Sequence, residues 1–135
     1  MKLSEETAII SLIKKMKLSL VSERYDPANF GNALIELADG HGLKIRITKD
    51  RSQYFIDLAI NSDEWFGLYQ LEGFLHPDSS IMLADSPIDR LCDLLKKNIV
   101  SYHAAFQGNY KELQQYIVDE KTKTLQRYKK SDKLS

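Results

Sequence analysis

The chain has 135 residues, of which 43% are hydrophobic and 28% are charged, a balance that fits one folded domain and excludes intrinsic disorder. The 19 basic and 19 acidic side chains leave no net charge to attract nucleic acid or anionic lipid, and the apolar runs are too short for a membrane-spanning helix. A single cysteine, Cys92, excludes an internal disulfide. We expect a cytoplasmic protein, because lysines interrupt the segment in which a signal peptide would need its apolar core.

The first predicted element is a helix from about Ser4 to about Glu23. Ser4 is a suitable N-cap, and Pro27 requires an end before it because the residue preceding a proline avoids the helical region. Between these limits apolar side chains recur at helical spacing, at Ile9, Leu12, Ile13, Met16 and Leu20.

The period then changes to two, as it does in strands with one buried face. Residues 43–48 alternate apolar with polar side chains and place Lys44 and Arg46 on the polar side. Short turns at 38–42 and 49–52 separate this segment from two apolar neighbours. The pattern predicts a three-stranded antiparallel meander over residues 30–37, 43–48 and 53–60.

Three helices are predicted after the sheet, over residues 65–75, from about Pro87 to about Gln107, and from about Tyr110 onward. Segregated strands and helices indicate the α+β class. We therefore predict a single α+β domain over residues 1–135: an N-terminal helix, the three-stranded antiparallel meander, then three helices packed on the sheet. Residues 120–135 are mostly polar, so we expect them to project or fray.

The residues predict no enzyme, metal site or cofactor. Cys92 and His103 lie eleven residues apart on one predicted helix, about 16 Å along its axis, which is too far for a catalytic dyad. His41 and His76 fall in a turn and a loop, without metal-ligand spacing. Carboxylates in a cleft between sheet and helices remain a minor enzymatic alternative. The few basic residues on the predicted sheet argue against nucleic acid as a partner.

The charges are unevenly distributed along the chain. Residues 56–95 carry a net charge of −7, whereas residues 96–135 carry +5. Such a run is commonly a solvated face, and it is also what an acidic surface for a basic partner requires. The acidic residues of the block are Asp57, Asp63, Glu64, Glu72, Asp78, Asp85, Asp89 and Asp93.

Three short segments carry a resemblance: Phe30-Gly31-Asn32, residues 50–57 (DRSQYFID) and residues 64–68 (EWFGL). Together they resemble the pattern F-G-N, D-R-G-Q-x-x-x-D and W-x-x-L of small bacterial immunity proteins from contact-dependent growth inhibition and polymorphic toxin systems, with Ser52 in place of a glycine. The resemblance implies a non-catalytic cytoplasmic inhibitor that binds the C-terminal toxin domain delivered by a sibling cell.

The leading hypothesis is therefore an immunity protein that neutralises a cognate toxin domain through an acidic and aromatic surface. The alternative is an adaptor or regulatory subunit that binds a protein through its basic C-terminal helix, residues 110–128. The sequence leaves the oligomeric state open. The residues predicted to contact the toxin are Asp63, Glu64, Glu72, Asp78 and Asp85, with Trp65 or Tyr69 as an aromatic anchor.

Overall fold

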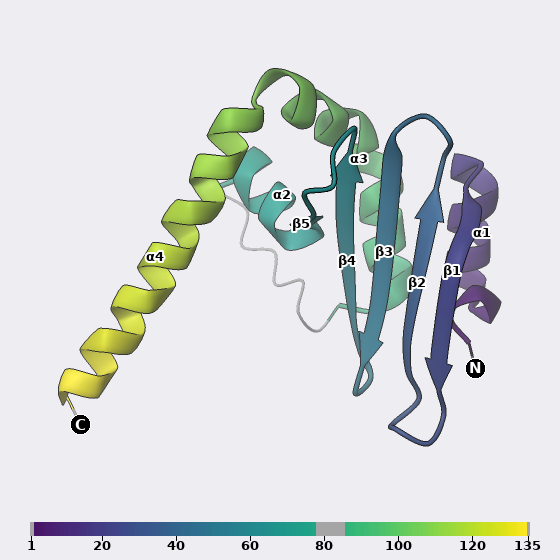
Figure 1. The fold of residues 1–135 in the computed structure, drawn as a ribbon, viewed down its shortest axis with the longest axis horizontal. Helices are drawn as coiled ribbons and strands as arrows, with labels where there is room; N and C mark the ends of the chain where they lie inside the picture. The colour runs from purple at the N-terminus through teal and green to yellow at the C-terminus, as the bar shows by residue number, and fades with distance from the viewer. Residues whose placement is uncertain (1, 78–85, 135) are drawn as a thin grey trace.

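The computed structural model describes residues 2–77 and 86–134, with side chains as far as residue 126. After a short 3-10 turn, Leu3–Glu5, helix α1 precedes five strands, and three helices follow (Figure 1). The bounds are α1 Thr7–Met16, β1 Ser19–Asp26, β2 Asn32–Ala38, β3 Leu43–Asp50, β4 Gln53–Ile60, β5 Phe66–Gly67, α2 Leu68–Leu75, α3 Ile88–Gly108 and α4 Tyr110–Leu134.

The predicted three-stranded meander is wrong, because the sheet has five strands in the order β1-β2-β3-β4-β5, each antiparallel to its neighbour. The predicted strands correspond to β2, β3 and β4. Strand β1 begins within the last five residues of the predicted N-terminal helix and continues beyond its end to Asp26. The two residues of β5 occupy the start of the predicted helix 65–75, so α2 begins only at Leu68.

Helix α1 ends at Met16 because the backbone of Lys17 turns into the left-handed region, with φ 53°. The N–H of Leu18 then donates to the carbonyl oxygen of Ile13 at 2.9 Å, which closes the helix. Residues 19–22 are Ser-Leu-Val-Ser, of which three have low helix propensity and only Leu20 is a strong helix former. Pairing with β2 therefore decides the conformation of this segment, and a local helical spacing does not reveal such pairing.

One face of the sheet is apolar and covered. Every second side chain of β2 and β3 is buried on it, among them Ile35, Ile45 and Ile47, each 0% exposed. Helices α1 and α3 lie behind this face and pack against each other (Figure 1). Helix α4 packs mainly on α2 and α3 instead of the sheet, and Figure 1 shows it running away from the rest of the molecule.

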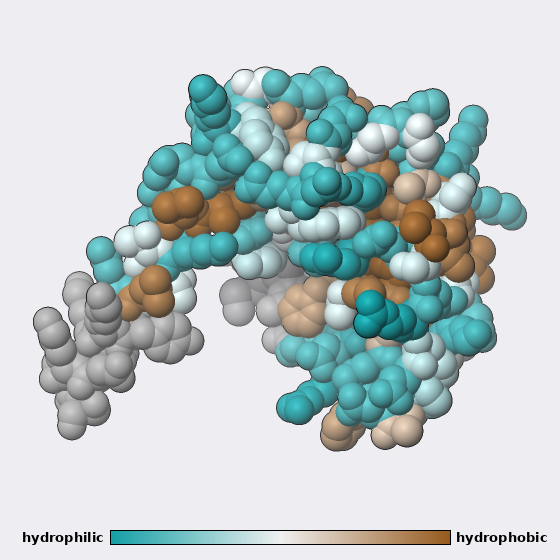
Figure 2. Space-filling view, viewed as in Figure 1, coloured by the Kyte–Doolittle hydropathy of each residue, from teal (hydrophilic) through white to brown (hydrophobic). Residues whose placement is uncertain are grey.

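No helix of the described residues covers the other face, which is called the open face below (Figure 1). Its side chains alternate with the buried ones and line up across the strands, because the register pairs Arg46 with Glu36 on one side and with Asp57 on the other. Figure 2 shows mostly polar side chains on this face with apolar ones between them. The described helices therefore leave this face of the sheet uncovered, although several of its side chains pair with one another.

Candidate functional site

The open face centres on the guanidinium of Arg46. It lies 4.4 Å from the centroid of the Trp65 ring, and the Nζ atom of Lys44 lies 5.4 Å from the same ring. The Nε atom of Arg46 is also 3.7 Å from Oδ2 of Asp57, on the neighbouring strand. Cation–π contact and the ion pair restrict these long side chains, which are one third exposed, before any partner arrives.

Burial raises the pKa of the Asp57 carboxyl, and the nearby charge of Arg46 lowers it by a smaller amount. Asp57 is thus a carboxylate that the protein keeps partly out of water, with one cation beside it. The residues of the second row on the open face, Leu34, Thr48 and Phe55, are paired across β2, β3 and β4. Phe55 is 39% exposed, so an aromatic ring stands on the open face beside the charged row.

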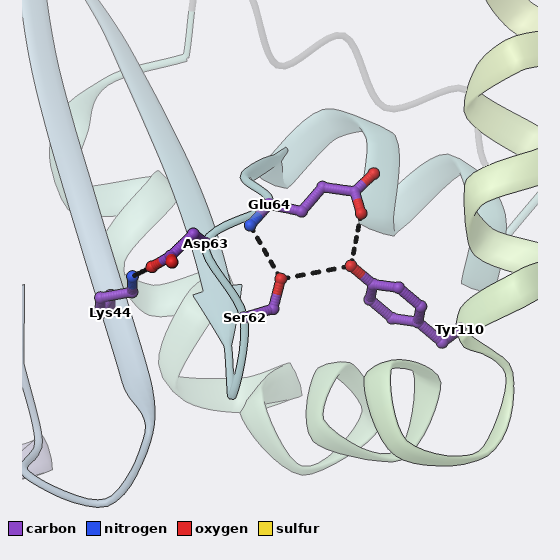
Figure 3. Close-up of polar contacts among 5 residues, drawn as sticks. All are labelled: Lys44, Ser62, Asp63, Glu64 and Tyr110. Atoms are coloured by element: carbon purple, nitrogen blue, oxygen red, sulfur yellow. Dashed lines mark hydrogen bonds and ion pairs between the residues drawn. The ribbon is translucent and has the colours of Figure 1, made fainter.

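The connection between β4 and β5 bears two of the predicted acidic contact residues, Asp63 and Glu64, and they point in opposite directions (Figure 3). Asp63 turns to the sheet, where its Oδ1 accepts a hydrogen bond from Lys44 at 2.6 Å. This contact lowers the pKa of the Asp63 carboxyl. Glu64 turns to α4 and accepts hydrogen bonds from Tyr110 at 2.5 Å and from Gln114 at 2.8 Å. Asp63 therefore bonds this connection to strand β3, and Glu64 bonds it to helix α4.

The hydroxyl of Ser62 completes this arrangement. It accepts a hydrogen bond from the backbone N–H of Glu64 at 2.8 Å and lies 3.3 Å from the Tyr110 hydroxyl (Figure 3). Partial burial and the hydrogen bond to Glu64 raise the pKa of Tyr110. Contacts with residues 62–64 thus help to hold the first turn of α4 in place.

Tyr69 is 62% exposed at the start of α2, beside the open face. A Cβ atom at Gly67 would lie 2.8 Å from its ring, so only glycine leaves room for the ring over the backbone of β5. The same position is 3.5 Å from Oδ1 of Asp57. Trp65 and Tyr69, the two predicted aromatic anchors, therefore stand at the same end of the open face.

Of the remaining predicted acids, Glu72 does not join this surface. Glu72 is only 4% exposed and lies between α2 and α3, where it accepts hydrogen bonds from the Tyr102 hydroxyl and, at 2.8 Å, from the Asn98 amide. Burial and the bond to Glu72 raise the pKa of Tyr102. Glu72 is a structural carboxylate in this fold. Asp78 and Asp85 lie outside the described residues.

The tip of the sheet brings two of the resemblance segments together. The backbone N–H of Arg51 donates to Oδ1 of Asn32 at 2.9 Å, and the Arg51 guanidinium lies 5.6 Å from the centroid of the Phe30 ring. Phe30 is 72% exposed and has a φ of 59°. Arg51 and Ser52 form the turn between β3 and β4 with φ 51° and 71°, the conformation for which glycine is favoured at position 52.

The sequence predicted Trp65 or Tyr69 as an aromatic anchor but not the cations that contact Trp65. The alternation of residues 43–48 already placed Lys44 and Arg46 on one face of a strand. The alternation did not predict the fifth strand, β5, which returns the chain to the sheet and brings Trp65 beside Lys44 and Arg46. The contact between Phe30 and Arg51 was also missed, because it joins two turns 21 positions apart in the sequence and no local pattern reveals it.

Other chemistry is limited in the described part of the chain. Cys92 is 1% exposed, and burial raises the pKa of its thiol to about 12, so it is an inert core residue at neutral pH. Among residues 2–77 and 86–134, no three side chains of the metal-binding types come together as a metal site. Within the same ranges, every helix is too short or too polar to cross a bilayer.

Comparisons with protein-family models, with curated proteins and with solved structures gave no match.

Proposed function

We propose that the chain is a toxin-neutralising immunity protein that binds the toxin's C-terminal domain through the open face and acts without catalysis. The observation that supports it best is the position of the resemblance segments. Asp57 and Trp65 lie together around Arg46 on the open face, and Phe30, Asn32 and Arg51 meet at the tip of the same sheet. Segments that are separate in the sequence thus come together at two places on one sheet.

The chemistry of this surface suits protein recognition. Tryptophan, tyrosine and arginine are the residues that most often dominate the binding energy of protein interfaces. Here Trp65 and Arg46 are held in contact before binding, which reduces the side-chain entropy lost when a partner docks. The ion pairs of Lys44 with Asp63 and of Arg46 with Asp57 present both signs of charge, so the proposed surface selects by charge pattern instead of net charge.

The first experiment is affinity capture with the tagged full chain from the cells that encode it, with identification of the partner by mass spectrometry. The captured toxin domain is then expressed in a host with and without this chain. The proposal predicts that the toxin stops growth and that the wild-type chain restores it. A captured partner without toxicity contradicts the immunity function.

The second experiment locates the interface. Arg46→Glu and Phe55→Ser alter the open face, and each is expected to weaken binding of the captured domain at least tenfold, as contacts in the centre of an interface do. Val100→Ser is the matched control, because Val100 is a 78% exposed apolar residue on α3, behind the sheet. Circular dichroism verifies that each variant is folded. Equal binding by all three variants contradicts the assignment to the open face while leaving immunity itself intact.

A further inference from the structure

Helix α4 leaves its described residues 118–126 exposed to solvent. Its inner part is anchored by Leu113 and Ile117, which are 0% and 9% exposed, but every described side chain from 118 to 126 is exposed. Val118 and Leu125 are 55% and 62% exposed and are seven residues apart, so they lie on one side of the helix. Figure 1 shows this part of α4 reaching beyond the other elements, and Figure 2 shows apolar side chains along it.

A groove runs beside this stripe, between α2 and α4, with a volume of about 520 Å³. Tyr69 of α2 forms one wall, and Ile117 and Leu125 of α4 form part of the other. The apolar surface that is buried at Ile117 therefore continues into solvent. An amphipathic helix is the element that fits a groove of this kind, through apolar side chains at spacings of three and four residues.

The charges of α4 differ between its two ends. The outer half is basic, since residues 121–134 carry a net charge of +5. The inner end is acidic: exposed Glu112, Asp119 and Glu120 lie on it, and Glu64 is bonded to it, whereas Lys111 is the basic residue there. A second α4 laid antiparallel would place each basic end beside an acidic end.

We propose that the groove takes the α4 helix of a second copy of this chain, with the two helices antiparallel about a two-fold axis near Lys121 and Thr122. That axis lies close to the midpoint of the 25-residue helix. It sets Val118 of each copy opposite the partner's Leu125, so the same patch serves both copies, as a two-fold interface requires. Lys121 lies near the axis, where a polar residue fixes the register of paired helices at some cost in stability. This interface adjoins the open face at Tyr69, which lines the groove, and it does not depend on the immunity function.

Sedimentation velocity of the full chain across the micromolar range tests the proposal. The expected result is a species of twice the 15.5 kDa chain mass at high concentration. Added salt should raise the dissociation constant of this dimer, because it screens the charges between the two helices. Leu125→Glu should weaken the dimer at least tenfold, because it puts a carboxylate opposite the partner's Val118. Val100→Glu makes the same kind of change at an exposed site on α3 and should leave the dimer unchanged. A chain that stays monomeric overturns the proposal and leaves the groove to another partner.

Cysteine cross-linking tests the antiparallel register. Lys121→Cys places a thiol beside the two-fold axis, so oxidation should join two copies rapidly. Lys123→Cys is the control, because position 123 lies about 200° around the helix from position 121, on the opposite side from the stripe. Native Cys92 is buried and does not compete. Equal cross-linking rates for the two variants contradict the proposed pairing even if a dimer forms.

Discussion

The two faces of the sheet are built from the same strands and serve different purposes. On β3, Ile45 and Ile47 are completely buried, while the Arg46 side chain between them is one third exposed and held by Trp65 and Asp57. The covered face is stabilised by apolar burial, and the open face is organised by ion pairs and a cation–π contact. Neighbouring residues of one strand should therefore respond to mutation in different ways, one through stability and the other through binding.

The acidic run of the sequence divides in the same manner. Asp63 and Glu64 are exposed and join surface elements, whereas Glu72 is buried and joins α2 to α3 through Tyr102 and Asn98. A block of like charges in the sequence is thus not one surface. Its members have to be separated into structural and exposed residues before any of them is assigned to a partner.

The largest expected effect is on the covered face. Ile45→Ala should lower the free energy of unfolding by about 2–5 kcal/mol, because it removes buried methyl groups and leaves a cavity. Thr48→Ala, on the open face of the same strand, should change it by no more than about 0.5 kcal/mol. Urea unfolding followed by circular dichroism measures both. Similar losses for the two variants would mean that the open face is also packed, and the distinction between the faces would fail.

The second effect concerns the buried carboxylate. Glu72→Ala should lower the free energy of unfolding by about 1–3 kcal/mol, because it leaves the Tyr102 hydroxyl and the Asn98 amide without their acceptor. Glu64→Ala is the surface control, since the groups that bond Glu64 are exposed and can bond to water instead. An equal loss in the control would contradict the separation of the acidic run into buried and exposed members.

The sequence predicted the elements whose pattern is local and missed those that depend on pairing. The alternation in residues 43–48 located β3. The Ser86-Pro87 pair predicted a helix from about Pro87, and α3 begins one residue later, at Ile88. Strand β1 was missed because Ile9, Leu12 and Leu20 fit a helical spacing, although Leu20 faces β2 across a strand pair. The same limit applies to Trp65, whose contact with Arg46 depends on the two-residue strand β5.

A smaller effect is expected from the contact at the centre of the open face. In a double-mutant cycle of Trp65→Leu and Arg46→Met, the coupling between the two side chains should be about 0.5–1 kcal/mol, the range for a partly exposed cation–π pair. Unfolding in urea gives the four free energies. Trp65→Leu with Thr48→Ala is the control pair, and it should show additive losses. Additivity in both cycles would remove the argument that the open face is organised before binding.

The smallest effect is a pH dependence that differs in sign between two aspartates of the open face. Burial raises the pKa of Asp57, so the folded state holds its proton more tightly than the unfolded state, and ionisation of this group as the pH rises reduces stability. Asp57→Asn abolishes that loss. The stability of the variant relative to wild type should therefore increase as the pH rises from about 4 to about 7. The test concerns only how this difference changes with pH, so a constant loss of stability with the Arg46 ion pair does not affect it.

Asp63 supplies the opposite case. Lys44 lowers its pKa, so its ionised form stabilises the folded state above the ordinary pKa of an aspartate, and this contribution is lost as the pH falls. Relative to wild type, Asp63→Asn should become less stable as the pH rises from about 2 to about 4, whereas Asp57→Asn should become more stable as it rises from about 4 to about 7. Urea unfolding of the three proteins at the two ends of each pH range measures the two slopes. Opposite slopes mean that Asp57 is shielded within the open face while Asp63 stands in water at its rim. Equal slopes would mean that both carboxylates lie in water, and the open face would then lack a shielded centre around Arg46.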